Sequence, residues 1–236
     1  FSGGGVWAGG TSVVANCFIR NNLAVEDPTA NMQIYPSGHG GGVFITDTAL
    51  VTDCKIVNNR ARRGGGGVAM DKFAMLQNSI IFGNSNLSGP LAEPPYSGGG
   101  AFISDHSFGV VVRNCRFTRN RTLGNGGGVC VDGSTTIENC VFNYNYARVG
   151  GGGFAFVANN NQELLNCTFY RNGASHNDNY SIISFGDLNI LNCIVSRGTL
   201  VDRANNKFYS INSTYSLIQE VTVAGGTGNI VANPLF

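Results

Sequence analysis

The sequence predicts an all-β protein, a parallel β-helix of about eight to nine coils with three short strands in each coil. Three recurring features indicate this fold: a glycine triplet, a small residue that is usually cysteine, and an asparagine five residues after that small residue. Together they repeat with a basic period of about 25 residues. The triplets are Gly3–Gly5, Gly40–Gly42, Gly65–Gly67, Gly98–Gly100, Gly126–Gly128 and Gly151–Gly153.

The first strand of each coil is expected directly after the glycine triplet, where short apolar segments such as Val43-Phe44-Ile45 and Phe154-Ala155-Phe156 stand. A second strand leads to the small residue, as in Val111-Val112-Arg113-Asn114-Cys115. Two residues beyond each small residue lies an apolar residue, which a period of two places on the same face. These apolar residues are Ile19, Ile56, Ile81, Phe117, Phe142, Phe169 and Val195.

Stacked coils turn a repeated position into a ladder of like side chains. We expect the small residues to form a buried ladder of free thiols, because in-register parallel strands point their Cβ atoms the same way and so disfavour disulfide bonds. This ladder comprises Cys17, Cys54, Ser79, Cys115, Cys140, Cys167 and Cys193. A second ladder, at a corner, comprises Asn22, Asn59, Asn84, Asn120, Asn145 and Asn172, since asparagine tolerates left-handed backbone and bonds locally.

Two long insertions, between Leu23 and His39 and between Ser85 and Ser97, fall at the same point of the repeat. They should protrude from one edge of the β-helix, either as a binding face or because corners tolerate insertions. If this face binds a sugar or a partner, Tyr35 and Tyr96 are the expected contacts, because both lie on proline-containing insertions.

Four aspartates recur six or seven residues after the start of a glycine triplet: Asp47, Asp71, Asp105 and Asp132. We expect them to line up as a stripe, which would act as a weak Ca²⁺ site or simply cap turns. A polysaccharide-cleaving enzyme would use Asp47, Asp71 and Asp105 as carboxylates with Arg116 as a base. Arg113, Arg116, Arg119 and Arg121 form the densest basic cluster, which either binds an acidic glycan or keeps the surface soluble. No cofactor is expected.

The low content of charged residues argues against two classes of partner. Charged residues make up 12% of the chain and the net charge is +1, which gives no electrostatic argument for nucleic acid or for an acidic membrane. We expect no membrane insertion by this segment. Because the chain begins inside a repeat, we expect residues 1–236 to be a single β-helix segment excerpted from a longer chain, with other coils or domains of that parent stacked on its ends.

The glycine triplets and the elements Phe117-Thr118-Arg119-Asn120, Phe142-Asn143-Tyr144-Asn145 and Phe169-Tyr170-Arg171-Asn172 resemble right-handed parallel β-helix repeats of surface proteins. They are similar to the repeats of chlamydial polymorphic outer membrane proteins. The resemblance implies a right-handed, pectate-lyase-like fold and secretion to the cell surface. It favours a structural or adhesive module over a polysaccharide lyase, a glycoside hydrolase or a glycan-binding module. The resemblance implies self-assembly or binding to a surface glycan.

Overall fold

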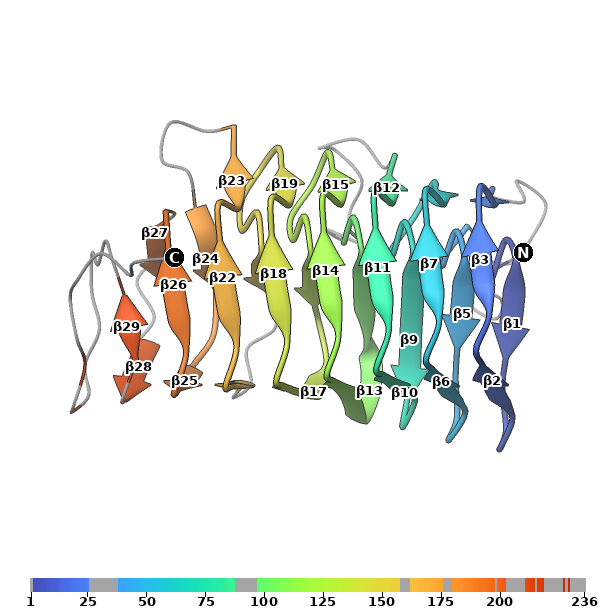
Figure 1. Cartoon of the computed structure of the whole chain (residues 1–236), viewed down its shortest axis with the longest axis horizontal. Helices are drawn as coiled ribbons and strands as arrows, with labels where there is room; N and C mark the ends of the chain where they lie inside the picture. Colours follow the sequence, from blue (N-terminus) through green and yellow to red (C-terminus); the bar gives the residue numbers. More distant parts are fainter. Residues whose placement is uncertain are drawn as a thin grey trace.

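The protein folds as a right-handed parallel β-helix, which confirms the predicted fold class. The computed structural model describes residues 2–25, 38–87, 97–157, 162–175, 180–197, 199–202, 211–214, 216–218, 227 and 229. The coils stack along one axis from β1 near the N-terminus to β29 (Figure 1). All paired strands run parallel, in sheets of 15, 8 and 6 strands.

The 15-stranded sheet supplies two sides of the coils. Its first side, which follows the glycine triplets, contains β1 (Val6–Ala8), β5 (Val43–Ile45), β9 (Val68–Lys72), β13 (Ala101–Arg113), β16 (Val129–Val131), β20 (Phe154–Phe156), β24 (Tyr180–Ser184) and β27 (Thr199–Asp202). The second side contains β2 (Val13–Ala15), β6 (Leu50–Thr52), β10 (Met75–Gln77), β17 (Ser134–Glu138), β21 (Gln162–Leu165), β25 (Leu188–Leu191) and β28 (Ile211–Thr214). The long strand β13 runs through both sides and joins them into one sheet.

The eight-stranded sheet follows the cysteine ladder, one strand for each of eight coils. It contains β3 (Phe18–Arg20), β7 (Lys55–Val57), β11 (Ile80–Phe82), β14 (Arg116–Thr118), β18 (Val141–Asn143), β22 (Thr168–Tyr170), β26 (Ile194–Ser196) and β29 (Leu217–Ile218). A six-stranded sheet of two-residue strands comes next, an element that the sequence patterns did not separate from the turn. It contains β4 (Leu23–Ala24), β8 (Arg60–Ala61), β12 (Ser85–Asn86), β15 (Arg121–Thr122), β19 (Tyr146–Ala147) and β23 (Gly173–Ala174).

Strict register gives the core its layered form. Ile56, Ile81 and Phe117 pair in succession on neighbouring strands, and all three are fully buried. The rings of Phe117 and Phe142 then stack with centroids 5.0 Å apart, and those of Phe142 and Phe169 with centroids 4.6 Å apart. Because each coil repeats the inward residues of the one before, a single apolar core extends along the axis.

The asparagine ladder is buried and hydrogen-bonded from coil to coil. Asn59, Asn84 and Asn120 each donate backbone and side-chain N–H groups to Oδ1 of the ladder asparagine in the next coil. Their Nδ2 groups also donate to a carbonyl oxygen of the preceding coil, such as Ile56 O for Asn84. The side-chain amides of these three asparagines therefore lie at a corner, and each links three successive coils by hydrogen bonds. This ladder was predicted from the sequence.

The cysteine ladder is also confirmed. Cys54, Cys115, Cys140, Cys167 and Cys193 are buried free thiols, whereas Cys17, in the first coil, is exposed. Ser79 takes the ladder position in the third coil and accepts a hydrogen bond from the backbone of Cys54 at 3.1 Å. Cys130 lies off the ladder, in a second buried cluster with Phe102, Ala155 and Ile183 on the middle positions of the first side.

Close backbone contact explains the glycine triplets. The first glycine of each triplet has a positive φ, from 63° at Gly40 to 95° at Gly98. At the second position, a Cβ on Gly41 would lie 2.2 Å from the carbonyl oxygen of Arg60 and 2.3 Å from that of Gly66. Glycine suits the first position because of its positive φ, and the second because no Cβ fits against the neighbouring backbone. Among the described residues there is no helix of the length and apolar character needed to span a membrane.

Candidate functional site

Asp47 is held in an exposed ion pair rather than presented as a reactive carboxylate. Its Oδ1 lies 2.6 Å from Lys72 Nζ, and its Oδ2 accepts a hydrogen bond from the backbone of Gly10 at 3.0 Å. The bond from Lys72 and the one from Gly10 lower the pKa of Asp47. Asp47 therefore stays ionised and bridges the first three coils at the turn that follows the first side.

The four aspartates do not form the predicted continuous stripe. Ile45 pairs with Met70, so the residue two positions later, Asp47, lies beside Lys72 and not beside Asp71. Asp71 accepts a hydrogen bond at 2.8 Å from Ser104 Oγ of the next coil instead. The prediction failed because the spacing from the glycine triplet is seven residues for Asp47 and six for Asp71, and one residue changes the register position.

The negative charge of Asp105 acts on Asp132. Asp132 is half-buried, and burial followed by the negative charge of Asp105 raises its pKa to about 6. Asp105 is exposed and lies 2.9 Å from Nδ1 of His106. Asp105 lies in β13, whereas Asp132 directly follows β16 (Val129–Val131).

The remaining residues of the predicted catalytic set lie elsewhere. Arg116 is on β14 of the eight-stranded sheet, whereas Asp71 and Asp105 are in β9 and β13 of the 15-stranded sheet. The described part of the chain contains no group of three histidine, cysteine or acidic residues that could hold a metal ion. Tyr35 and Tyr96 lie outside the described residues, but the insertions that carry them start after β4 and β12 of the same six-stranded sheet.

Charge is segregated around the β-helix. Residues 18–25, 55–63, 80–87, 116–124, 141–149, 168–175 and 194–197, which run from the eight-stranded sheet to the end of the two-residue strands, contain no aspartate or glutamate. We call these segments the basic face. Its cations are Arg20, Lys55, Arg60, Arg62, Arg63, Arg116, Arg119, Arg121, Arg148, Arg171 and Arg197.

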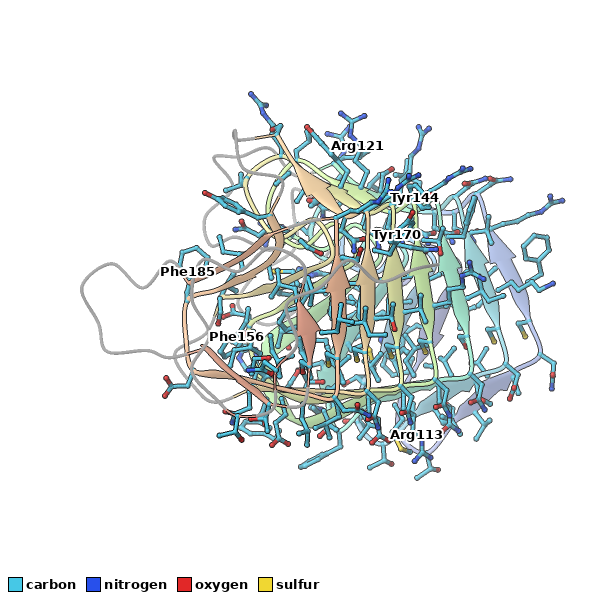
Figure 2. All side chains as sticks on the ribbon, turned by 60° about the vertical axis from the view of Figure 1, so that its left-hand side comes forward. Arg113, Arg121, Tyr144, Phe156, Tyr170 and Phe185 are labelled. Carbon is cyan, nitrogen blue, oxygen red and sulfur yellow. The ribbon has the colours of Figure 1, made fainter. Side chains whose placement is uncertain are left out.

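The acidic residues whose side chains the structure describes lie on the other sides. They are Asp47, Asp53, Asp71, Asp105, Asp132, Glu138, Glu163 and Asp187. Figure 2 shows the separation: Arg121 points away from the body on one side, and Arg113, at the end of β13, lies on the opposite side. The four arginines that are neighbours in sequence therefore do not form one cluster, because Arg113 Nε is engaged with Gln77 Oε1 on the second side at 2.8 Å.

One register position on the basic face has left-handed backbone in seven successive coils. Its occupants are Asn21, Asn58, Gly83, Arg119, Tyr144, Arg171 and Arg197, with φ between 49° and 64°. Asparagine and glycine suit this conformation, whereas arginine and tyrosine are uncommon in it. The corner is therefore built from favourable residues in the first three coils and from large side chains in the next four.

These large side chains form a connected array of rings and guanidinium groups. The guanidinium carbon of Arg171 lies 5.7 Å from the ring centroid of Tyr144 and 5.1 Å from that of Tyr170. Arg171 Nη1 also donates a hydrogen bond to the Tyr144 hydroxyl at 3.1 Å. Arg119 lies over Tyr144, and Arg197 over Tyr170, each at 6.0 Å. Figure 2 shows Tyr144 and Tyr170 side by side below Arg121. We call this array the Arg–Tyr ridge.

A shallow hollow of about 480 Å³ continues the ridge towards the N-terminus, lined by Asn21, Asn22, Leu23, Asn58, Arg60, Gly83 and Ser85. It exists because the left-handed position carries small residues here; a Cβ on Gly83 would lie 2.4 Å from Asn58 Oδ1. Ridge and hollow are one surface, since Gly83 donates a backbone hydrogen bond to Thr118, the residue before Arg119.

The sequence contained a signal for this face that the search for local clusters missed. Arginines cluster visibly between Arg60 and Arg63 and between Arg113 and Arg121, but the absence of acids from the same part of every repeat is apparent only once the repeats are aligned. The ridge itself depends on neighbours about 25 residues apart, such as Arg119 and Tyr144.

Comparisons with known proteins give no relative: no protein-family model, no curated protein and no solved structure matches this chain.

Proposed function

We propose that this chain is a non-enzymatic structural and adhesive module of an extracellular or cell-surface protein, which forms a rod and assembles through its coils. The observation that carries this proposal is the apolar first coil. Trp7, Val13, Phe18 and Leu23 point outward from its four strands and are 51–63% exposed. We call these four residues the apolar collar.

Cations occupy two of these four positions in the second and fourth coils. Lys55 pairs with Phe18 and Arg60 with Leu23 in the second coil, and Arg116 and Arg121 take the same positions in the fourth. Such cations are the residues expected at a surface in contact with water, and the apolar collar lacks them.

Residues of the first coil that point towards the core are only partly covered by the described coils. Cys17, equivalent to the buried Cys54, is exposed there, and Val6 and Val14 are only partly buried although they point into the core. A parallel strand edge presents unpaired N–H and C=O groups. Another β-helix coil stacked in register would pair these groups and cover both the core residues and the rim of the collar.

The resemblance to right-handed, pectate-lyase-like repeats of surface proteins, including chlamydial polymorphic outer membrane proteins, supports placement outside the cell and a role in adhesion. The enzyme alternatives, a polysaccharide lyase or a glycoside hydrolase, have less support. Asp47 is engaged with Lys72, Asp71 with Ser104, and Arg116 lies on another sheet. The glycan-binding alternative is favoured by the basic face.

Sedimentation of the purified chain over a range of concentrations tests the assembly role. We expect self-association that weakens when Val13 and Phe18 are both replaced by lysine. The control is Thr136→Lys, an exposed residue of the same side in the fifth coil. A chain that stays monomeric, with Cys17 equally reactive to thiol reagents at all concentrations, would contradict the proposal.

Incubation with neutral and acidic polysaccharides, with and without Ca²⁺, tests the enzyme alternatives. We expect no unsaturated products and no new reducing ends. Turnover that disappears in the double variant Asp71→Asn/Asp105→Asn, with the fold retained, would replace the structural function by a catalytic one.

A further inference from the structure

The basic face concentrates like charges that the fold itself does not need. Arg171 and Arg197 occupy the same left-handed position in successive coils, which follow one another at about the strand spacing of 4.8 Å, so their charges repel each other. The segments of this face offer no acidic side chain to offset the repulsion. A surface of this kind has the field to attract and hold a polyanion.

We propose that the Arg–Tyr ridge and the adjoining hollow bind a linear polysaccharide that carries sulfate or carboxylate groups, with the polymer lying along the β-helix axis. The proposal rests on the adhesive function proposed above and names the class of its ligand. The contacts expected to bind the anionic groups are the guanidinium groups of Arg119, Arg121 and Arg171.

The backbone conformation indicates that the ridge serves something other than folding. Asn21, Asn58 and Gly83 close the same turn in the first three coils with residues that favour positive φ. Arg119, Tyr144 and Arg171 close it in the next coils with φ of 53°, 56° and 49°, although large side chains disfavour this region. Unfavourable residues that persist at one surface position are typical of a functional site.

The tyrosine rings hold the guanidinium groups in place. Arg171 lies against Tyr144 and Tyr170, and Arg121 lies 5.2 Å from the ring centroid of Tyr146. A guanidinium group that rests on a ring keeps its N–H donors directed outward and loses little freedom when an anion binds. Such planar donors match carboxylates and tetrahedral oxyanions, that is phosphates and sulfates.

The same arrangement argues against nucleic acid. Proteins bind single strands by stacking bases on free aromatic faces. Here guanidinium groups approach Tyr144, Tyr146 and Tyr170 within 5.1–6.0 Å and occupy that space. A ligand that needs charge and hydrogen bonds but no stacking, which is the chemistry of an acidic sugar polymer, fits better.

The hollow supplies contacts for uncharged parts of the polymer. Asn21, Asn58 and Ser85 offer amide and hydroxyl groups there, next to the guanidinium group of Arg60. Sugar hydroxyls pair with such groups. Ridge and hollow follow a straight line along the coils, so the surface matches an extended polymer more closely than a flat membrane.

The test uses a pair of substitutions that remove charge without disturbing the turn. In the double variant Arg119→Asn/Arg171→Asn, each residue is replaced by the one that already occupies the equivalent position in the first two coils. We expect an unchanged or higher Tm. The matched control, Lys72→Asn/Arg113→Gln, removes the same charge from the other sides; Lys72 also has positive φ, at 53°.

Binding of the full chain is measured by fluorescence anisotropy with labelled dextran sulfate, alginate and uncharged dextran, and with a single-stranded DNA oligonucleotide and anionic phospholipid vesicles as competitors. We expect dextran sulfate, alginate or both to bind, with an affinity that falls as salt is added, and uncharged dextran not to bind. The double variant Arg119→Asn/Arg171→Asn should bind about tenfold or more weakly than the unmodified chain, and the control variant should lose less than about twofold in affinity.

Three results would overturn the proposal: no binding of either anionic polysaccharide, equal weakening by the ridge and control variants, or displacement by DNA or vesicles at equal or lower concentration. Sedimentation of the same samples separates this proposal from the assembly function, because both double variants retain the apolar collar. If the unmodified chain self-associates but binds neither anionic polysaccharide, only the polysaccharide site is refuted, and if it binds a polysaccharide but stays monomeric, only the assembly role is refuted.

Discussion

The backbone nitrogen and the Nδ2 group of Asn120 both donate hydrogen bonds to Oδ1 of Asn145, each at 3.0 Å. Oδ1 of Asn120 receives the same two bonds from Asn84. Each ladder amide therefore donates hydrogen bonds to one coil and accepts them from another. Its removal leaves hydrogen-bonding groups of both coils without a partner.

Asn120→Ala should destabilise the protein by about 2–4 kcal/mol, because it leaves the N–H groups of Asn84 and the carbonyl of Ile81 buried without these partners. Urea denaturation measures the change. Asn114→Ala is the control, since Asn114 is an exposed asparagine with φ of 54°, and should cost about 1 kcal/mol. Equal costs for the two variants would show that the buried ladder adds no stability of its own.

Phe142→Ala should cost about 3–5 kcal/mol, because the ring is fully buried between Phe117 and Phe169 and its removal opens a cavity in a layered core. Phe142→Leu should cost less than half as much. Phe108→Ala, at a ring that is 67% exposed, should change the unfolding free energy by about 0.5 kcal/mol or less. Similar unfolding free energies for the alanine and leucine variants would contradict this prediction, because they would show that the core relaxes to fill the cavity.

Thiol chemistry should distinguish one cysteine from the other six. Burial is the main cause of the raised pKa of Cys54, Cys130 and Cys140, whereas Cys17 is exposed. A chromogenic thiol reagent should therefore react with one cysteine in the native protein and with all 7 in denaturant. Cys17→Ser should abolish the native reaction. Several equivalents reacting quickly in the native state would show that the inner coils open readily.

The half-buried carboxyl of Asp132 and the buried imidazole of His39 should have opposite effects on the unfolding free energy as the pH falls. The folded-state pKa of Asp132 is about 6, above its ordinary 3.8, so its protonation stabilises the fold at low pH and this contribution is lost as pH rises through 6. His39 is the reverse: burial, with a smaller effect of Arg63, lowers its pKa to about 4, so its contribution is present above pH 6.5 and is lost as pH falls towards 4.

Asp132→Asn should leave only the histidine effect of this pair. The unfolding free energy of the variant should rise with pH between about 4 and 6.5 more steeply than that of the wild type, and should exceed the wild-type value at pH 7 by about 1–2 kcal/mol after allowance for solvent screening. Urea titrations at several pH values measure both quantities. If the unfolding free energies of the variant and the wild type changed with pH in the same way, the raised pKa of Asp132 would be contradicted.

The sequence was a good guide wherever a residue type recurs at a fixed spacing. Ladders of Asn84, Cys115 and Phe142 could be predicted because in-register stacking makes every coil present the same requirement, and a repeated requirement leaves a repeated residue. The short strands of the six-stranded sheet were missed, since two residues such as Arg60-Ala61 carry no detectable period.

Positions that vary from coil to coil were the difficult ones. The aspartate stripe failed because Asp47 and Asp71 differ by one residue in register, a shift that composition does not reveal. The Arg–Tyr ridge was overlooked for a related reason: Arg119, Tyr144 and Arg171 share one position but no residue type. Alignment of coils, rather than proximity along the chain, brings such side chains together.

In the part of the chain that the structure describes, the one-sided placement of acids and bases gives the β-helix a permanent electric dipole perpendicular to its long axis. Because the coils are in register, each adds its moment in nearly the same direction, and the total grows with the number of coils rather than averaging out. Near a surface of fixed negative charge, the torque on this dipole would turn the rod onto its side. Its ends would then face along the surface, where they meet the ends of other rods in the same orientation.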